Sequence, residues 1–187
     1  MAAKRFGIVC STFNEPYVGS LLEHTLAGLG GQACDVVRVP GSFEIPLQVQ
    51  RLAASKKYGA VIALGIIWQG KTAHASEILR AATDALMRIG LEHDVPVIHQ
   101  ILSVASEKEA KKRTSGKKLN RGREAAEAAL AVLAAGPKAA PRRVRKKGVA
   151  PKVAPTKAKA VRKKVTAKKA RPRPRQMSKK AAANGGA

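Results

Sequence analysis

Residues 60–78 read A-V-I-A-L-G-I-I-W-Q-G-K-T-A-H-A-S-E-I, and this stretch decides the fold class. The apolar run Ala60–Leu64 predicts a buried strand that ends at Gly65. A short loop with a second glycine follows, and an amphipathic helix is expected to begin at Thr72. A strand that leads through a glycine-rich turn into a helix offers free N–H groups and a helix dipole to an anion. His74 adds an imidazole, which moves protons near neutral pH, so this segment is a candidate reaction centre.

Strands and helices alternate on both sides of this segment. Apolar runs predict strands over 6–10, 36–39, 60–64 and 95–102, and helical spacing predicts helices over 18–29, 43 or 45 to 54, 72–89, 106–114 and 121–135. Strands that are apolar throughout and separated by helices indicate a parallel sheet covered on both faces. We therefore expect an α/β domain with three flavodoxin-like layers around a four-stranded parallel sheet. Such sheets bind ligands beyond the carboxyl ends of their strands.

The composition of the chain changes near residue 136. Of the 36 Lys and Arg residues, 19 lie in residues 137–187, which contain no Asp or Glu. The same segment holds six of the ten prolines and no aromatic residue, so it cannot bury enough apolar surface to offset the entropy of ordering. We therefore expect one domain over residues 1–136 and a disordered basic tail over residues 137–187.

No segment of the sequence has the pattern of a membrane or export signal. No apolar run approaches the ~20 residues of a spanning helix, and residues 1–10 lack the apolar centre of a signal peptide. We therefore expect a cytoplasmic protein with no membrane partner.

Several segments, taken in order, resemble the 6,7-dimethyl-8-ribityllumazine synthase family. They are F-N at 13–14, V-P-G-S-F-E-I-P at 39–46, Y-G-A-V-I-A-L-G at 58–65, G-K-T-A-H at 70–74, P-V-I at 96–98 and N-R-G-R-E-A-A at 120–126. The resemblance spans about residues 4–135. It implies a transferase of riboflavin biosynthesis that condenses 5-amino-6-(D-ribitylamino)uracil with 3,4-dihydroxy-2-butanone 4-phosphate. The products are 6,7-dimethyl-8-ribityllumazine, phosphate and water, and the family uses no metal or organic cofactor.

The resemblance also implies which residues bind the pyrimidine substrate. They are Phe13, Ser42, Phe43, Glu44, Ile66, Ile67, Trp68 and His99. Phe13 would stack on the pyrimidine ring, whereas the residues alone leave a core aromatic at a strand end as an equal alternative. Glu44 would hold a ribityl hydroxyl, and a carboxylate at this position can also cap the following helix.

Two of these positions, and the residue that follows one of them, depart from the pattern of the family. Trp68 stands where an aliphatic residue is common, and the next residue, Gln69, stands where many members have arginine. We expect altered packing there with activity retained. His99 stands where phenylalanine is frequent, and its imidazole can still stack although its charge could respond to pH.

The resemblance assigns the phosphate of the second substrate to Lys71, Thr72, Arg113 and Arg121. Many members have a small residue at position 71, so the Lys71 ammonium either adds direct charge attraction or only faces solvent. Arg113 lies in a basic helical run, and only the resemblance separates it from its solvated neighbours as a partner for phosphate. A lone histidine at a helix start is more often structural. The G-x-T-x-H pattern reverses this for His74 and implies proton transfer in imine formation, phosphate elimination and ring closure.

Family sites lie between subunits, which implies that a neighbouring copy supplies His99 and Arg113. The expected assembly is a homo-oligomer, a pentamer, and the compact segment 113–120 favours an icosahedral shell of such pentamers. The tail resembles the basic tails of histone H1-like proteins. This predicts either nucleic-acid binding that is indifferent to sequence or a solubilising extension without a partner. The alternative function is therefore a nucleic-acid-binding protein on a lumazine-synthase-like scaffold, which would have no reason to keep the catalytic residues together.

Overall fold

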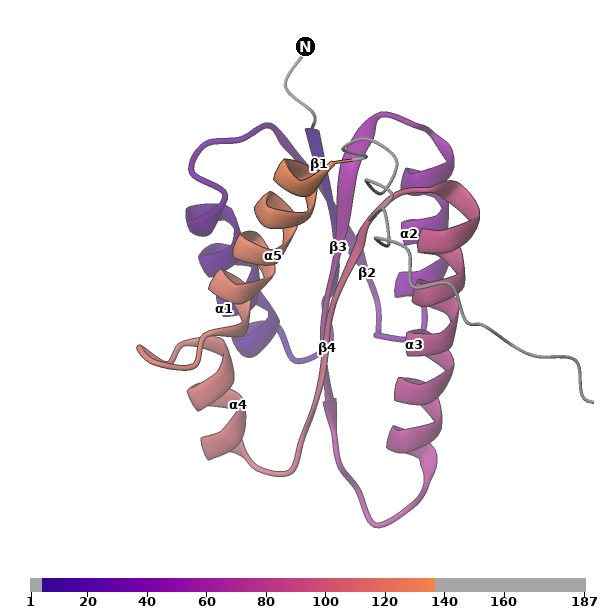
Figure 1. The fold of residues 1–187 in the computed structure, drawn as a ribbon. Helices are drawn as coiled ribbons and strands as arrows, with labels where there is room; N and C mark the ends of the chain where they lie inside the picture. The colour runs from indigo at the N-terminus through magenta and orange to yellow at the C-terminus, as the bar shows by residue number, and fades with distance from the viewer. Residues whose placement is uncertain (1–4, 137–187) are drawn as a thin grey trace, which may run out of the picture. The chain divides into compact units, whose positions relative to one another are not determined.

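The computed structural model describes residues 5–136, and Figure 1 shows their ribbon. The elements in chain order are β1 (Arg5–Ser11), α1 (Glu15–Gly28), β2 (Cys34–Val39), α2 (Ile45–Ala54), β3 (Tyr58–Trp68), α3 (His74–His93), β4 (Val97–Val104), α4 (Glu107–Thr114) and α5 (Arg121–Ala135). The predicted disordered tail lies outside the described residues.

The strands form one four-stranded parallel sheet in the order β2-β1-β3-β4. Helices α1, α4 and α5 cover one face of the sheet, and α2 and α3 cover the other (Figure 1). The expected three-layer, flavodoxin-like α/β architecture is therefore confirmed. The topology places the carboxyl ends of the two central strands, β1 and β3, side by side at one edge of the sheet, with β4 as an outer strand.

The core consists of two apolar clusters, one on each face of the sheet. Successive side chains of a strand point to opposite faces, so Ile8 and Ile62 enter the cluster beneath α1 and α5. Their chain neighbours Val9 and Val61 enter the cluster beneath α2 and α3. Both faces are therefore buried, which is why the central strands are apolar over residues 6–10 and 59–67 and do not alternate with polar residues there.

Two of the expected helix boundaries follow from side-chain caps. The Ser106 hydroxyl accepts a hydrogen bond from the Glu109 N–H at 3.2 Å before α4. The Asn120 carboxamide oxygen accepts from the N–H groups of Gly122 and Arg123, both at 3.1 Å, before α5. These side chains satisfy the N–H groups that a helix start leaves free, which stabilises each start by about 1 kcal/mol.

The prediction that the third strand ends at Gly65 is wrong, because β3 continues to Trp68 and pairs with β4 along this length. Gly65 lies under Ser42, and a Cβ at Gly65 would lie 2.7 Å from the Ser42 Oγ. The glycine therefore serves close packing within the strand and does not mark a turn. The connecting loop is correspondingly shorter, and α3 begins at His74, not at Thr72.

Other boundaries shift by a few residues. Helix α1 begins at 15 in place of 18 and α3 ends at 93 in place of 89, while β2 begins at 34 in place of 36 and β4 spans 97–104 in place of 95–102. Within residues 5–136, no helix combines the length and apolar character that crossing a bilayer requires.

Candidate active site

The carboxyl ends of β1, β2 and β3 and the starts of α2 and α3 surround a pocket of about 700 Å³. Its lining residues are Phe13, Gly41, Ser42, Phe43, Glu44, Ile66, Ile67, Trp68, His74, Ala75 and Ile78. The structure therefore brings together His74 and every pyrimidine-site residue that the sequence predicted, except His99. Gly41, Ala75 and Ile78 were not predicted.

Two aromatic rings at the pocket are largely open to solvent. Phe13 is 66% exposed and Phe43 is 63% exposed. The Phe13 backbone is nevertheless fixed, because its N–H donates to the Pro40 carbonyl at 3.0 Å. The alternative of a core aromatic at position 13 is therefore wrong. Exposed aromatic faces at the wall of a concave site are typical of a site for a flat, partly apolar ligand.

The floor of the pocket is formed by the last residues of β3. Ile66 and Ile67 are buried in the sheet, each on a different face. Ser42 is also buried and lies against Gly65, whose missing side chain leaves room for the hydroxyl. The floor is therefore rigid, and backbone groups of β3 together with one hydroxyl lie at its edge.

Trp68 joins the end of β3 to the turn after β1. Its indole Nε1–H donates to the Asn14 Oδ1 at 2.7 Å, and the Asn14 Nδ2 donates to the Ile66 carbonyl at 3.0 Å. The Trp68 ring also packs edge-on against Tyr17, with ring centroids 5.6 Å apart. Asn14 has a left-handed backbone (φ 63°), which asparagine tolerates better than most residues. Trp68 therefore forms a hydrogen-bonded link across the pocket wall, and the expectation that its packing differs from that of the family stays a prediction.

The role of Asn14 was missed in the sequence. The Glu15-Pro16 pair that follows it marks a helix start, and this pattern indicates the position of Asn14 but not its side-chain bonds.

Glu44 and His74 are the two ionisable groups of the pocket lining. Glu44 occupies the cap position of α2 but makes no side-chain cap hydrogen bond, so the capping alternative is not confirmed. Its carboxylate is exposed beside Gly41 and can accept hydrogen bonds from a ligand. His74 is the first residue of α3, and its ring makes no hydrogen bond to another residue within 5–136. A carboxylate acceptor and an unengaged imidazole thus border one pocket.

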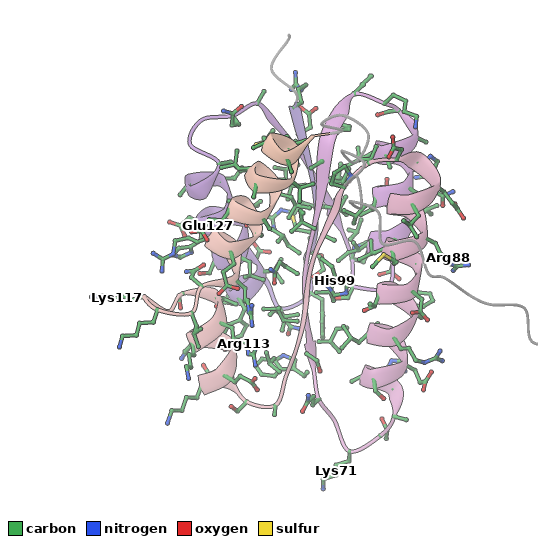
Figure 2. The ribbon with its side chains drawn as sticks, viewed as in Figure 1. Lys71, Arg88, His99, Arg113, Lys117 and Glu127 are labelled. Carbon is green, nitrogen blue, oxygen red and sulfur yellow. The ribbon has the colours of Figure 1, made fainter. Side chains whose placement is uncertain are left out.

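Lys71 and Thr72 lie next to the pocket but do not line it. Both are exposed in the loop 69–73, which leads to the N-terminus of α3. Figure 2 shows Lys71 at the tip of this loop, with its side chain pointing away from the sheet. In a single chain the ammonium therefore faces solvent, whereas the first-turn N–H groups of α3 remain available to an anion.

Arg113, Arg121 and His99 lie away from this pocket. Arg113 lies on α4, across the sheet from α2 and α3 (Figure 2). Its guanidinium pairs with Glu109 at 2.8 Å. Arg121 pairs with Glu124. The hydrogen bond from the Ala105 N–H, followed by that from Arg113, lowers the pKa of Glu109, which stays ionised and fixes the arginine.

His99 lies on β4 and lines a second groove of about 620 Å³ between β4 and α3. Figure 2 shows it on the α3 side of the sheet, opposite the side that carries Arg113. A single chain does not bring these two residues to the pocket, as expected if a neighbouring copy supplies them. Their supply by a neighbour stays a prediction.

The arrangement suits a particular kind of chemistry. The pocket has apolar walls with aromatic faces for a planar ring, a carboxylate for hydroxyl or amine groups, and an imidazole at a helix N-terminus for proton transfer beside an anion. Within residues 5–136, no three His, Cys, Asp or Glu side chains converge on a point where a metal ion could be held.

The chain is similar to known proteins over most of its described length. Residues 3–135 match the family model described as 6,7-dimethyl-8-ribityllumazine synthase. A protein of that name from Xanthomonas euvesicatoria pv. vesicatoria (strain 85-10) is 37% identical over 134 residues, 69% of this chain and 87% of the relative. Another from Xylella fastidiosa (strain M12) is 36% identical over 137 residues, 71% of this chain and 89% of the relative. Among solved structures, a de novo designed Rossmann fold protein has a TM-score of 0.36 and 18% identity over 58% of this chain and 91% of its own.

Proposed function

Since the chain belongs to the 6,7-dimethyl-8-ribityllumazine synthase family, we propose that its pocket joins 5-amino-6-(D-ribitylamino)uracil to 3,4-dihydroxy-2-butanone 4-phosphate. The products are 6,7-dimethyl-8-ribityllumazine, phosphate and water. The chain is a transferase of riboflavin biosynthesis, and the identity of the two substrates and the roles of single residues form the proposal. The observation that carries it is one pocket that holds Phe13, Glu44 and His74 together.

The pyrimidine is assigned to the floor and walls of the pocket. The ring stacks on Phe13, beside Phe43, while backbone groups of Ile66 and Ile67 bind its polar edge. Glu44 accepts hydrogen bonds from ribityl hydroxyls, since its carboxylate has no capping partner. Both aromatic rings are exposed in the free chain, so a stacked ligand would remove their apolar surface from water.

His74 is the proposed acid–base residue. Imine formation, phosphate elimination and ring closure each need a proton to move, and an imidazole can donate and accept in turn. Such proton transfer contributes roughly 10²- to 10⁴-fold to the rate. A larger share comes from holding the two substrates together, because the amine is already a good nucleophile for the ketone.

The phosphate is assigned to the start of α3. The Thr72 hydroxyl and the free N–H groups of the first turn lie beside His74, and Lys71 adds positive charge when its side chain turns inward. Arg113, with Arg121, completes this subsite from a neighbouring subunit, where a planar guanidinium can pair with phosphate.

A neighbouring copy is also favoured by the groove that contains His99. Met87 (64% exposed), Leu91 (75%) and Val132 (40%) line it, and such an apolar surface is covered in a stable assembly. The proposed oligomer is a pentamer, with the icosahedral shell as its larger form. Light scattering and negative-stain imaging of the purified protein distinguish the two.

The first test uses Trp68, which is the single tryptophan of the chain and lines the pocket. The pyrimidine substrate should change its emission, and adding the second substrate should produce lumazine absorbance. His74→Ala should lower kcat by roughly 10²-fold or more, and Arg113→Ala should raise KM for the phosphate substrate. Lys117→Ala, on the exposed loop after α4, is the control and should behave as wild type. Turnover no faster than the uncatalysed reaction would reject the proposal.

A second test asks whether two subunits share the site. His74→Ala and Arg113→Ala chains are unfolded together, allowed to reassemble in equal amounts, and assayed at a concentration of the phosphate substrate far below the raised KM of Arg113→Ala. If Arg113 serves the neighbour's pocket, about a quarter of the sites receive both intact residues in a head-to-tail ring, and activity rises well above that of either variant alone. If both residues serve the same subunit, the mixture stays at the low activity of the two variants.

The basic tail supports a second, accessory role. We propose that residues 137–187, with 19 Lys and Arg and no acidic residue, bind nucleic acid without sequence preference through its phosphates. The full chain and a chain that ends at Gly136 are compared for DNA and RNA binding across salt concentrations. Binding that requires the tail and falls steeply with salt is expected, whereas identical curves would show that the tail has no such role.

A further inference from the structure

The side chain of His99 is held at both ring nitrogens. The Ile101 backbone N–H donates to Nδ1 at 3.3 Å, and Nε2 lies 2.8 Å from the Thr83 Oγ1. Thr83 in turn donates its hydroxyl hydrogen to the Leu79 carbonyl at 2.8 Å, one turn earlier in α3. The chain of contacts thus runs from the edge strand β4, through the imidazole, to the backbone of α3.

These contacts favour one protonation state of the ring. A backbone N–H can only donate, so Nδ1 is the acceptor and carries no hydrogen. The Thr83 hydroxyl hydrogen is already directed at Leu79, so its oxygen accepts from Nε2, which carries the hydrogen. A second proton on Nδ1 would face the Ile101 N–H and break that bond.

We propose that Thr83 is a positioning residue that, together with the Ile101 N–H, holds His99 as a neutral imidazole in one tautomer and one ring orientation. The ring then offers a flat, uncharged aromatic face from β4, in place of a phenylalanine. The inference rests on the proposed function in one respect. The pyrimidine bound in a neighbouring subunit's pocket is the ligand that this face is expected to contact.

The surroundings of His99 favour the neutral ring. Among residues 5–136, Asp94, in the turn before β4, is the only other ionisable residue that lines the groove. The neighbouring strand contributes Ala63 beside His99, and α3 contributes the apolar side chains of Leu79 and Leu86 together with Thr83. Burial lowers the pKa of His99 below its usual value and outweighs a hydrogen bond to its own backbone, which acts in the opposite direction. The response to pH that the sequence suggested therefore lies at more acid pH than for a free imidazole.

The edge position of β4 explains why this arrangement is useful. An outer strand exposes backbone N–H groups that have no strand partner. His99 satisfies one of them with its own side chain, so the ring is fixed by the backbone of the strand that carries it. A phenylalanine at this position could form neither this bond nor the one to Thr83.

The test reads the ring nitrogens directly. The chain has four histidines, so solid-state NMR of sedimented, ¹⁵N-histidine-labelled full-length protein resolves their tautomers at any assembly size. Subtraction of the His99→Phe spectrum identifies the His99 signals. In the wild type, His99 should carry hydrogen on Nε2 alone at pH 7, and also at a pH slightly below the ordinary pKa of histidine. Thr83→Val should give a mixture of tautomers, and Thr83→Ser, which keeps the hydroxyl, should restore the single form.

Kinetics then test the positioning role. Thr83→Val should raise KM for the pyrimidine substrate roughly three- to tenfold, the range expected for one lost hydrogen bond, with kcat and the other KM unchanged. Thr83→Ser should behave as wild type. A doubly protonated or Nδ1–H ring in the wild type at pH 7 would overturn the inference whether or not the protein is active. A normal pyrimidine KM in Thr83→Val would overturn the positioning role, whereas an inactive wild type with the stated tautomer would count against the proposed function alone.

Discussion

Replacement of Trp68 by phenylalanine should lower the free energy of unfolding, because it weakens the link between β3 and the turn after β1. Two terms contribute. The first is the hydrogen bond from Nε1 to the Asn14 oxygen at 2.7 Å, which phenylalanine cannot make. A bond between neutral groups contributes about 0.5–1.5 kcal/mol. The second is the smaller ring, which loses roughly 40 Å² of apolar contact, worth about 1 kcal/mol at about 25 cal/mol/Å².

The expected loss in free energy of unfolding is therefore about 2 kcal/mol, and a double-mutant cycle separates its two parts. The cycle combines Trp68→Phe with Asn14→Gly, because glycine accepts the left-handed backbone of position 14 without strain. The coupling between the two changes should be about 1 kcal/mol, the hydrogen bond alone.

Urea unfolding of the four chains, followed by far-UV circular dichroism at one protein concentration, measures this coupling. The equal concentration matters because assembly shifts the apparent stability. A coupling near zero, with each single change still destabilising, would refute the reasoning. It would mean that the indole stabilises the turn only through its packing against Tyr17.

Two further predictions concern stability. Gly122→Ala should destabilise the fold by about 1–3 kcal/mol, because its Cβ would lie 2.5 Å from the Leu21 carbonyl of α1. Gly19→Ala, within α1, should instead stabilise it by up to about 1 kcal/mol, since only the flexible end of a glutamate is near; thermal unfolding of both variants checks the opposite signs. The hydrogen bond from Tyr58 is the main cause that lowers the pKa of Asp35 below its ordinary value of 3.8. The carboxylate therefore adds stability above that pH and loses it as the pH falls through the lowered pKa, so Asp35→Asn should change the acid unfolding curve by removing this dependence below about pH 4.

Much of the fold could be predicted from the sequence, and the central strands show why. Ile8 and Val9 enter different clusters, as do Val61 and Ile62, so each strand had to be apolar throughout. This pattern specifies a parallel sheet covered on both faces, whereas the strand order comes from the structure. The end of β3 was not accessible, because Gly65 has the local signature of a turn. Its place in the strand depends on Ser42, which approaches from another segment.

The candidate site likewise has features that the sequence could predict and contacts that it could not. Residues at the ends of parallel strands meet at one edge of the sheet, so the approach of Phe13 and Ser42 to the end of β3 could be predicted from local patterns. The bond between Asn14 and Trp68 could not, since it joins residues 54 positions apart and depends on side-chain direction. The hydrogen bonds of His99 were hidden for the same reason, because they join β4 to α3.

The pocket of a single chain is open to solvent, and this indicates that another chain is needed to close it. Phe13 and Phe43 are about two-thirds exposed, and His74 is exposed as well. In the proposed reaction, an imine intermediate must be shielded from water for ring closure to outrun hydrolysis, and no described element of the same chain covers this side of the pocket. The chain meanwhile holds two groups in fixed geometry away from its own pocket, namely Arg113 on Glu109 and His99 on Thr83. These two groups have no ligand within the described part of their own chain, and the pocket has no cover there. The proposed head-to-tail contact between copies of this chain would supply both.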